Sequence, residues 1–215
     1  MNLTETLAAR VALGRKKIPA TILDIMDGAT GKLIEKQISK KALLEGSTFP
    51  SFNLPNINGK ELSLEEVRGS KATIISFYRG GWCPYCNIEL QALEKELASF
   101  KTLGANLIAI TPETPDNSLT TAEKNEVTFE VLSDINNVLG KEVGLVFELS
   151  KDLQKVYAEK FNIDLGKYNH NTSGELPMAA TYVIDDRNVI KYAFVTEDYT
   201  KRAAINEIKE VLKKL

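Results

Sequence analysis

The apolar positions of the chain follow two different patterns along its length. In the first part, Leu3, Leu7 and Val11 recur at helical spacing, which predicts a helical N-terminal extension over residues 1–45. In the second part, short β-branched runs alternate with longer amphipathic segments, as in a domain of alternating strands and helices. We therefore expect an α/β domain over residues 46–215. The extension is expected either to pack on this domain or to contact a partner subunit.

A strand, a helix and a second strand are predicted near the centre of the chain. The compact apolar run ATIISFY, residues 72–78, is typical of a buried central strand. Residues 84–103 are expected to form a long helix, because apolar residues such as Leu93 and Leu97 follow one another by three or four. The segment NLIAI, residues 106–110, is predicted to be the next strand. Because a helix connects the two strands, we expect them to run parallel.

The remaining segments predict a mixed sheet covered by helices. Short strands are expected on both sides of the Asn-Gly turn at residues 58–59, and the sequence DDRN at residues 185–188 is predicted to turn an antiparallel hairpin. Further helices are predicted over residues 114–124, 136–143, 151–160 and 201–213, and the two hairpin strands over residues 181–184 and 189–195. Strands that alternate with helices and end in a hairpin indicate an α/β fold.

The charge balance argues against several classes of partner. With 27 basic and 29 acidic residues and a formal net charge of −2, the protein is not expected to bind nucleic acid or an anionic membrane. The sequence contains no run of about 18 apolar residues, so no transmembrane helix is predicted. Its N-terminal segment contains Glu5 and lacks an uninterrupted apolar run, so no secretory signal is expected. Two cysteines cannot build a long-range disulfide framework, and the simplest expectation is a cytoplasmic protein.

Both cysteines lie in one motif, Cys83-Pro84-Tyr85-Cys86, between the predicted central strand and the long helix. Pro84 suits the first position of a helix, where its missing N–H group would be unpaired in any case. Residues three apart on a helix have neighbouring side chains, which brings the two thiols within reach of a disulfide bond. The free N–H groups and the dipole of a helix start favour a thiolate over a thiol. Arg79 adds a nearby cation, which is expected to lower the pKa of a thiol further.

Three other interpretations of the pair are weaker. A zinc site needs four ligands, and the two cysteines with the single histidine, His170, cannot supply them, so no metal is expected. His170 itself lies in a polar loop and is expected to be exposed. Two inert core thiols would have no reason to meet at a helix start. A structural disulfide across one turn would add little in a reducing compartment. The sequence therefore predicts a redox-active pair.

The residues around the pair resemble a known family. The motif WCPYC is similar to the active-site motif of the thioredoxin and glutaredoxin superfamily. The stretches PSFNLPNINGKELSLEEVRG, FYRGGWCPYCNIELQALEKEL, TPETPDNSLTTAEKN and LPMAATYVID resemble the peroxiredoxin-like branch of the AhpC/TSA family, which covers the chain from about Gly46 onward. The resemblance implies a thioredoxin-like α/β fold, in which helices flank a central mixed sheet.

The resemblance also implies a function. It suggests a thiol-dependent peroxidase that reduces hydrogen peroxide or organic hydroperoxides and needs no cofactor. An external thioredoxin- or glutaredoxin-type reductant would recycle it, and by analogy with relatives a homodimer is expected. Two other functions stay open: a thiol–disulfide oxidoreductase that acts on protein disulfides, and a redox-responsive binding protein that does not turn over.

Two alignments assign the cysteines differently. Peroxiredoxins carry the pattern Pro-x-x-x-Thr-x-x-Cys with a glutamate three residues later. On this chain the pattern puts Cys86 at the peroxide-attacking position, Cys83 in place of the threonine and Glu89 at the glutamate. The thioredoxin pattern instead makes Cys83 the attacking thiol and Cys86 the resolving one. We prefer Cys86 for attack by a small margin.

The chain departs from the family pattern at three positions. Arg79 stands where the peroxiredoxin proline belongs, and Ala179 stands about where that family has an arginine near its active site. Loss of that arginine argues against fast turnover unless Arg79 replaces it. Thioredoxin-like domains also place a cis-proline beside the cysteines, and Pro177 is the nearest candidate.

Several neighbours of the cysteines are candidates for forming the substrate pocket or tuning the thiols. Gly81 would let backbone N–H groups approach a substrate closely or would only make the turn. Trp82 would shield the thiols, serve as a docking surface or pack beside the helix start. Met178 would line the pocket or fill core space. Glu89 would pair with a basic residue or be an exposed helix residue, and we prefer the second by a small margin. The candidate set is Arg79, Gly81, Trp82, Pro84, Pro177 and Met178.

Overall fold

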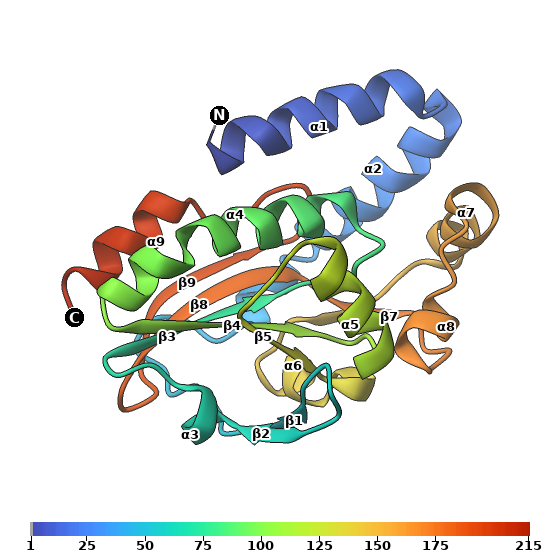
Figure 1. Ribbon diagram of the computed structural model, residues 1–215. Helices are drawn as coiled ribbons and strands as arrows, with labels where there is room; N and C mark the ends of the chain where they lie inside the picture. Colours follow the sequence, from blue (N-terminus) through green and yellow to red (C-terminus); the bar gives the residue numbers. More distant parts are fainter. Residues whose placement is uncertain (1) are drawn as a thin grey trace.

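A five-stranded mixed sheet forms the centre of the molecule, as the computed structural model of residues 2–215 shows (Figure 1). Its strands lie in the order β5-β4-β3-β8-β9. They are β3 (Ala72–Phe77), β4 (Ala105–Thr111), β5 (Glu130–Ser133), β8 (Ala179–Asp185) and β9 (Ile190–Thr196). β3 runs parallel to β4 and β4 to β5, whereas β8 pairs antiparallel with both β3 and β9. The predicted parallel pair, the hairpin and the mixed sheet are confirmed.

Helices cover both faces of this sheet. α4 (Pro84–Thr102) and α9 (Ile205–Leu212) lie on one face, above the sheet in Figure 1. The other face carries α6 (Val138–Glu142), α3 (Leu64–Val67) and the hairpin of β1 (Asn53–Pro55) and β2 (Glu61–Ser63). The remaining elements are α5 (Pro115–Lys124), β6 (Val146–Glu148), α7 (Lys151–Phe161), α8 (Leu165–Asn169), β7 (Glu175–Pro177) and two short 3-10 helices, Ile38–Lys41 and Ile135–Asn137. Within residues 2–215, no helix combines the length and the apolar character that crossing a bilayer demands.

Alternation of side chains along β3 divides the core into two clusters. Ile74 faces the side of α4, where it packs in one buried cluster with Leu90 and Phe100. Ile75 and Phe77 face the opposite side and belong to a second cluster. Because both faces are covered, all six residues of β3 are buried. The carboxyl end of β3 is thus a rigid position from which the next loop and α4 start.

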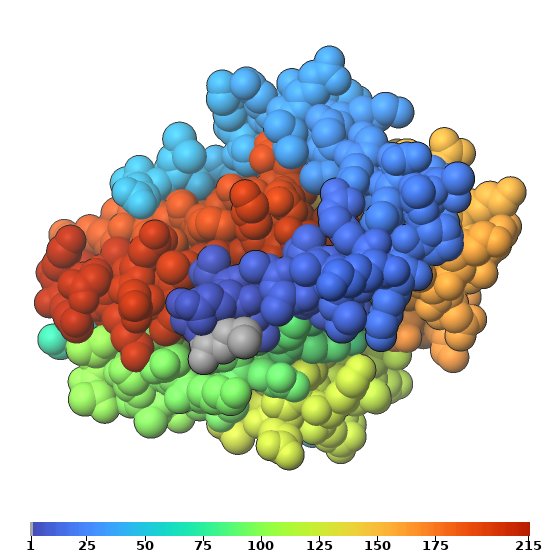
Figure 2. Space-filling model, turned by 90° about the horizontal axis from the view of Figure 1, so that it is seen from above, coloured from blue at the N-terminus to red at the C-terminus, as the bar shows by residue number. Residues whose placement is uncertain are grey.

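The N-terminal extension is helical, as predicted, and lies against the main domain. α1 (Leu3–Lys17) begins with a capping box in which Asn2 and Glu5 exchange hydrogen bonds. The helix ends before Pro19, and α2 (Ala20–Glu35) follows. α1 packs on α4 and α2 packs on α7. Figure 2 shows α1 lying along the border between α4 and the C-terminal segment, and α2 lying beside the orange segment that contains α7.

Several boundaries differ from the sequence prediction for local reasons. The helix expected over residues 136–143 begins only at Val138, because Asn136 and Asn137 adopt left-handed backbone angles, with φ of 64° and 54°. The last helix begins at Ile205 rather than at Lys201. The strands β5, β6 and β7 and the helices α3 and α8 were not predicted, and each has at most five residues, too few to show a clear period.

Candidate active site at the Cys83–Cys86 pair

A tight loop carries the chain from the end of β3 to the start of α4. Gly80 has φ of 146°, which favours glycine, and a Cβ atom at this position would collide with the Trp82 indole nitrogen. The Cys83 N–H donates to the Gly80 carbonyl at 3.0 Å, and Cys83 is the N-cap of α4. Pro84 occupies the first position of the helix, as predicted. Cys83 therefore lies at the positive end of a 19-residue helix.

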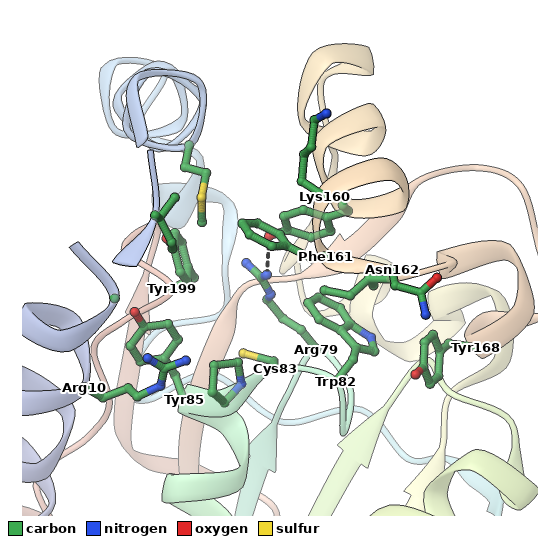
Figure 3. A pocket seen from close by; sticks show the side chains of 16 residues that line it. Arg10, Arg79, Trp82, Cys83, Tyr85, Lys160, Phe161, Asn162, Tyr168 and Tyr199 are labelled. Carbon is green, nitrogen blue, oxygen red and sulfur yellow. Dashed lines mark hydrogen bonds between the residues drawn. The ribbon is translucent and has the colours of Figure 1, made fainter. Parts of the chain in front are cut away.

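The two sulfurs lie at different depths. Both thiols are free and buried, with 1% of Cys83 and 0% of Cys86 exposed. Cys83 lines a cavity of about 570 Å³, whereas Cys86 is not among the residues that line it. Figure 3 shows the Cys83 side chain at the floor of this cavity, between Tyr85 and Arg79. A small molecule in the cavity would therefore meet Cys83 first.

Arg79 is buried beside the cavity, in agreement with its prediction as a candidate neighbour of the thiols. Only 4% of it is exposed, and its guanidinium donates to the Tyr157 hydroxyl at 2.6 Å. The guanidinium carbon lies 5.0 Å from the ring centre of Trp82 and 4.9 Å from that of Tyr199. Its Nε atom has no hydrogen-bond partner within residues 2–215. Arg79 thus holds a positive charge, with a free donor, close to Cys83.

A second arginine, Arg202, reaches the inner thiol. Its Nη2 atom donates to the Cys86 sulfur at 3.1 Å, and its Nε atom donates to Glu89. Two backbone carbonyls, those of Tyr199 and Lys201, accept bonds from Nη1 at 2.9 and 2.7 Å. Glu89 is 1% exposed, so the preferred prediction of an exposed residue was wrong, and the alternative of a pair with a basic residue is confirmed. Its carboxylate is buried because Arg202 neutralises it, although burial still raises the pKa of Glu89 to about 7.

The surroundings of the pair place the first thiolate on Cys83. Burial raises the pKa of Cys83, but a hydrogen bond from Cys86 and the charges of Arg79 and Arg202 outweigh it and lower the pKa to about 5. At Cys86, burial and the neighbouring Cys83 hold the pKa well above its ordinary value despite Arg202. At neutral pH the pair therefore holds one proton, with Cys86 as the thiol and Cys83 as the thiolate.

Glu113 is a buried carboxyl group that the sequence analysis did not single out. It accepts the N–H of Gly81 at 3.0 Å and the hydroxyl of Thr121 at 3.4 Å. A Cβ atom on Gly81 would collide with Thr121, so this position requires glycine. Burial raises the pKa of Glu113 to about 7, although the bond from Gly81 lowers it. Glu113 fixes the loop backbone directly before Trp82 and Cys83.

The structure brings some of the predicted residues together and separates others. Arg79, Trp82 and Pro84 line the cavity with Cys83. Gly81 lies behind the loop, where its backbone binds Glu113. His170 is exposed, as predicted.

The predicted residues from the β7–β8 segment are not part of the cavity. Pro177 and Met178 do not line it, and Met178 packs in the cluster on the opposite face of the sheet, the core role that was one of its two readings. The expectation of a cis-proline at Pro177 was wrong, because no peptide bond within residues 2–215 is cis. Pro177 instead pairs with Val146 as part of β7.

The cavity also contains residues that the sequence analysis missed. Tyr157 comes from α7, Tyr199 from the loop after β9 and Arg10 from α1. They lie far from the cysteines along the chain, and none belongs to a motif. The position expected to carry an arginine is Ala179, and Arg202 supplies the guanidinium from a different segment.

The chain is similar to known proteins over most of its length. Residues 46–193 match the AhpC/TSA family. A chloroplastic peroxiredoxin Q of Populus jackii is 27% identical over 171 residues, which are 80% of this chain and 68% of the relative. A putative peroxiredoxin of Mycobacterium tuberculosis is 28% identical over 143 residues, which are 62% of this chain and 90% of the relative.

The fold is also similar to that of solved structures. The crystal structure of the peroxidoxin BcpB from Mycobacterium tuberculosis matches 80% of this chain and 97% of its own, with a TM-score of 0.61 at 18% identity. AhpC of the same organism matches 80% of this chain and 92% of its own, with a TM-score of 0.60 at 17% identity. These similarities confirm the thioredoxin-like fold that the sequence resemblance implied. Since the family match spans more than half of the chain, the protein belongs to the AhpC/TSA family as a peroxiredoxin-like member.

Proposed function

We propose that the protein is a thiol peroxidase that reduces hydrogen peroxide or organic hydroperoxides through Cys83 and Cys86. One observation carries the proposal: a cysteine with a pKa of about 5 lies on the floor of a cavity, next to a second thiol and a buried arginine. A thiolate is the nucleophile that peroxide chemistry needs, and the second thiol allows the oxidised product to be resolved.

Cys83 is the attacking residue in this proposal, which reverses the order that the peroxiredoxin alignment favoured. Cys83 lines the cavity, whereas Cys86 is 0% exposed and holds its proton. The Cys83 sulfur attacks the terminal oxygen of the hydroperoxide and forms an S–O bond as the O–O bond breaks. The leaving alkoxide takes a proton from water in the cavity, which gives a sulfenic acid and an alcohol. Arg79, with its free Nε donor, stabilises the charge that develops on the leaving oxygen.

Cys86 resolves the sulfenic acid. Its sulfur attacks the Cys83 sulfur, an S–S bond forms, and the hydroxyl group leaves with the Cys86 proton as water. Arg202 donates to the Cys86 sulfur at 3.1 Å, so it stabilises negative charge as that thiol gives up its proton. An external reductant then supplies two electrons and two protons by thiol–disulfide exchange, and both thiols are restored. A thioredoxin- or glutaredoxin-type reductant, a homodimer and a cytoplasmic location stay predictions.

Stopped-flow measurement of peroxide consumption tests the assignment with matched variants. We expect Cys83→Ser to consume no peroxide. Cys86→Ser is expected to consume one equivalent and to retain a sulfenic acid on Cys83, which dimedone labels and mass spectrometry locates. The opposite pattern, with the trapped sulfenic acid on Cys86, would restore the alignment-based order. No peroxide consumption by the wild type would refute the peroxidase function.

A thiol–disulfide oxidoreductase is the second candidate function. The low pKa of Cys83, the first cysteine of the motif, favours it, because such a thiolate also attacks disulfides. Cys83 is only 1% exposed, and residues of α1 and α2 line the cavity above it, which weighs against a folded protein as substrate. Insulin reduction by Cys86→Ser and wild type separates the two: rapid insulin reduction without peroxide turnover would favour this candidate.

A further inference from the structure

The cavity above Cys83 contains more positive charge than a Cys83 thiolate balances. Arg79, Arg10 and Lys160 line it, and no aspartate or glutamate of residues 2–215 does so. A thiolate on Cys83 compensates one of the three cations. The field in the cavity therefore favours a ligand that carries a negative charge of its own.

Arg10 is the cation best placed to bind such a charge. It is half-buried, and its guanidinium carbon lies 6.0 Å from the ring centre of Tyr85, two residues after Cys83. Within residues 2–215 its side chain has neither a hydrogen-bond acceptor nor an ion-pair partner, in contrast to Arg15 on the same helix, which pairs with Asp27 at 2.7 Å. Figure 3 shows the Arg10 side chain next to Tyr85, whereas Lys160 is directed away from the cavity floor.

The walls of the cavity favour an apolar and flat body. Its volume of about 570 Å³ exceeds what hydrogen peroxide needs and lies in the range of sites for small organic molecules. Aromatic side chains from four separate segments surround the space: Trp82, Tyr85, Tyr157, Phe161, Tyr168 and Tyr199. Such rings provide large apolar area at a low cost in conformational entropy.

These observations indicate a ligand with a negatively charged group and an apolar body. Resting on the proposed peroxidase function, we propose that the cavity selects an aromatic or similarly apolar hydroperoxide that carries a carboxylate, and that Arg10 binds the carboxylate. The hydroperoxide group lies at Cys83 and Arg79, and the apolar body lies between the aromatic rings. The chemistry at sulfur is the same as for any hydroperoxide, since the carboxylate takes no part in it.

This assignment gives the N-terminal extension a function. α1 supplies Arg10 and Gly14, and α2 supplies Met26, so the extension forms one wall of the cavity. Gly14 lies at this wall beside Arg10 and Tyr85, where a Cβ atom would make ordinary contacts 3.7 Å from Arg10 Nη1 and 3.8 Å from the Tyr85 hydroxyl. Arg10 acts as a specificity-determining residue and not as a catalytic one.

Cumene hydroperoxide with a para-carboxylate, and the methyl ester of the same compound, test the proposal by kcat/KM. The two substrates differ in charge and share the reacting group, so their ratio is independent of how much enzyme is folded. We expect the wild type to prefer the acid by about tenfold, the effect of one charge-assisted hydrogen bond at a partly exposed site. The preference is expected to vanish in Arg10→Gln, to persist in part in Arg10→Lys, and to fall as ionic strength rises.

Lys17→Gln is the matched control, because Lys17 is an exposed cation on the same helix that does not line the cavity. It is expected to keep the wild-type ratio. A ratio near one in the wild type, or an unchanged ratio in Arg10→Gln, would overturn the proposal. An effect of Arg10→Gln that is confined to reduction of the disulfide by a carboxylated thiol such as mercaptopropionate would also overturn it. Arg10 would then bind the carboxylate of the reductant and not that of the hydroperoxide.

Binding of an unreactive analogue separates this inference from the proposed function. Trp82 is the single tryptophan of the chain and lines the cavity, so its fluorescence reports a ligand there. We expect 4-isopropylbenzoate to bind about tenfold more weakly to Arg10→Gln than to wild type, and its methyl ester to bind both equally. Binding with this pattern but without peroxide turnover would refute only the peroxidase. Peroxide turnover without charge selection would refute only the role of Arg10.

Discussion

Replacing Arg202 by methionine perturbs the buried ion pair that supports the inner thiol. The side chains of Arg202 and Glu89 are 1% and 2% exposed, and Arg202 also donates to the Cys86 sulfur at 3.1 Å. Removing one partner of a buried ion pair strands the other charge, at a cost of about 3–5 kcal/mol. Glu89 relieves part of this cost by taking a proton, because burial has already raised its pKa to about 7. We expect Arg202→Met to lower the free energy of unfolding by about 2–4 kcal/mol at pH 8, and by less at pH 6.

A double variant distinguishes packing from chemistry. Arg202→Met with Glu89→Leu replaces the ion pair by apolar side chains, and it is expected to regain most of the lost stability. It does not replace the donor to Cys86, so the disulfide should still form at least about tenfold more slowly than in wild type. Urea unfolding followed by Trp82 fluorescence measures stability, and stopped-flow fluorescence after one equivalent of peroxide measures disulfide formation.

Two results would refute this reasoning. A loss below about 1 kcal/mol for Arg202→Met at pH 8 would mean that the pair contributes no more than a surface salt bridge. A double variant that regains the wild-type rate of disulfide formation would show that Arg202 acts on Cys86 only through packing.

Three further predictions concern the loop and the outer thiol. The thiolate absorbance of Cys83 at 240 nm should titrate with a midpoint near pH 5, and Arg79→Met should raise that midpoint by about one unit or more; an unchanged midpoint would exclude Arg79 from the thiol's electrostatic environment. Burial raises the folded-state pKa of Glu113 to about 7, so the contribution of its protonated form to the free energy of unfolding is present at low pH and is lost as the pH rises through 7. Glu113→Gln should therefore be more stable than wild type at pH 8, and its free energy of unfolding should fall less as the pH rises toward 7. An unfolding profile with the wild-type slope would contradict this. Gly80→Ala should lower the free energy of unfolding by about 2–4 kcal/mol, because a Cβ atom with φ of 146° meets Trp82, and a wild-type urea midpoint would disprove the clash.

Features encoded in contiguous segments were predictable from the sequence. The apolar run of β3 and the period of α4 each extend over several residues, so both elements and their parallel connection could be inferred. The thiol pair at the helix start followed from the same pattern. Short elements such as α8 and the left-handed backbone at Asn136 and Asn137 have no comparable signature.

The surroundings of the thiols could not be predicted, because they are assembled from distant segments. Glu89 looks like an exposed helix position until Arg202, 113 residues later, is placed against it. Arg79 looks like a turn residue until Tyr157 and Tyr199 enclose it. Partners at such separations are set by the tertiary fold, and a single sequence carries no local pattern that identifies them.

The contact between Arg202 and Cys86 also makes the reactivity of the thiol pair depend on synthesis of the C-terminal segment. Arg202 lies 116 residues after Cys86, so during synthesis the two cysteines leave the ribosome long before the guanidinium that contacts them exists. Until the segment after β9 has docked, this part of the electrostatic environment is missing and the motif remains closer to an ordinary dithiol. The hydrogen bond that Arg202 donates to the Cys86 sulfur is therefore available only after the C-terminal segment has been synthesised and folded.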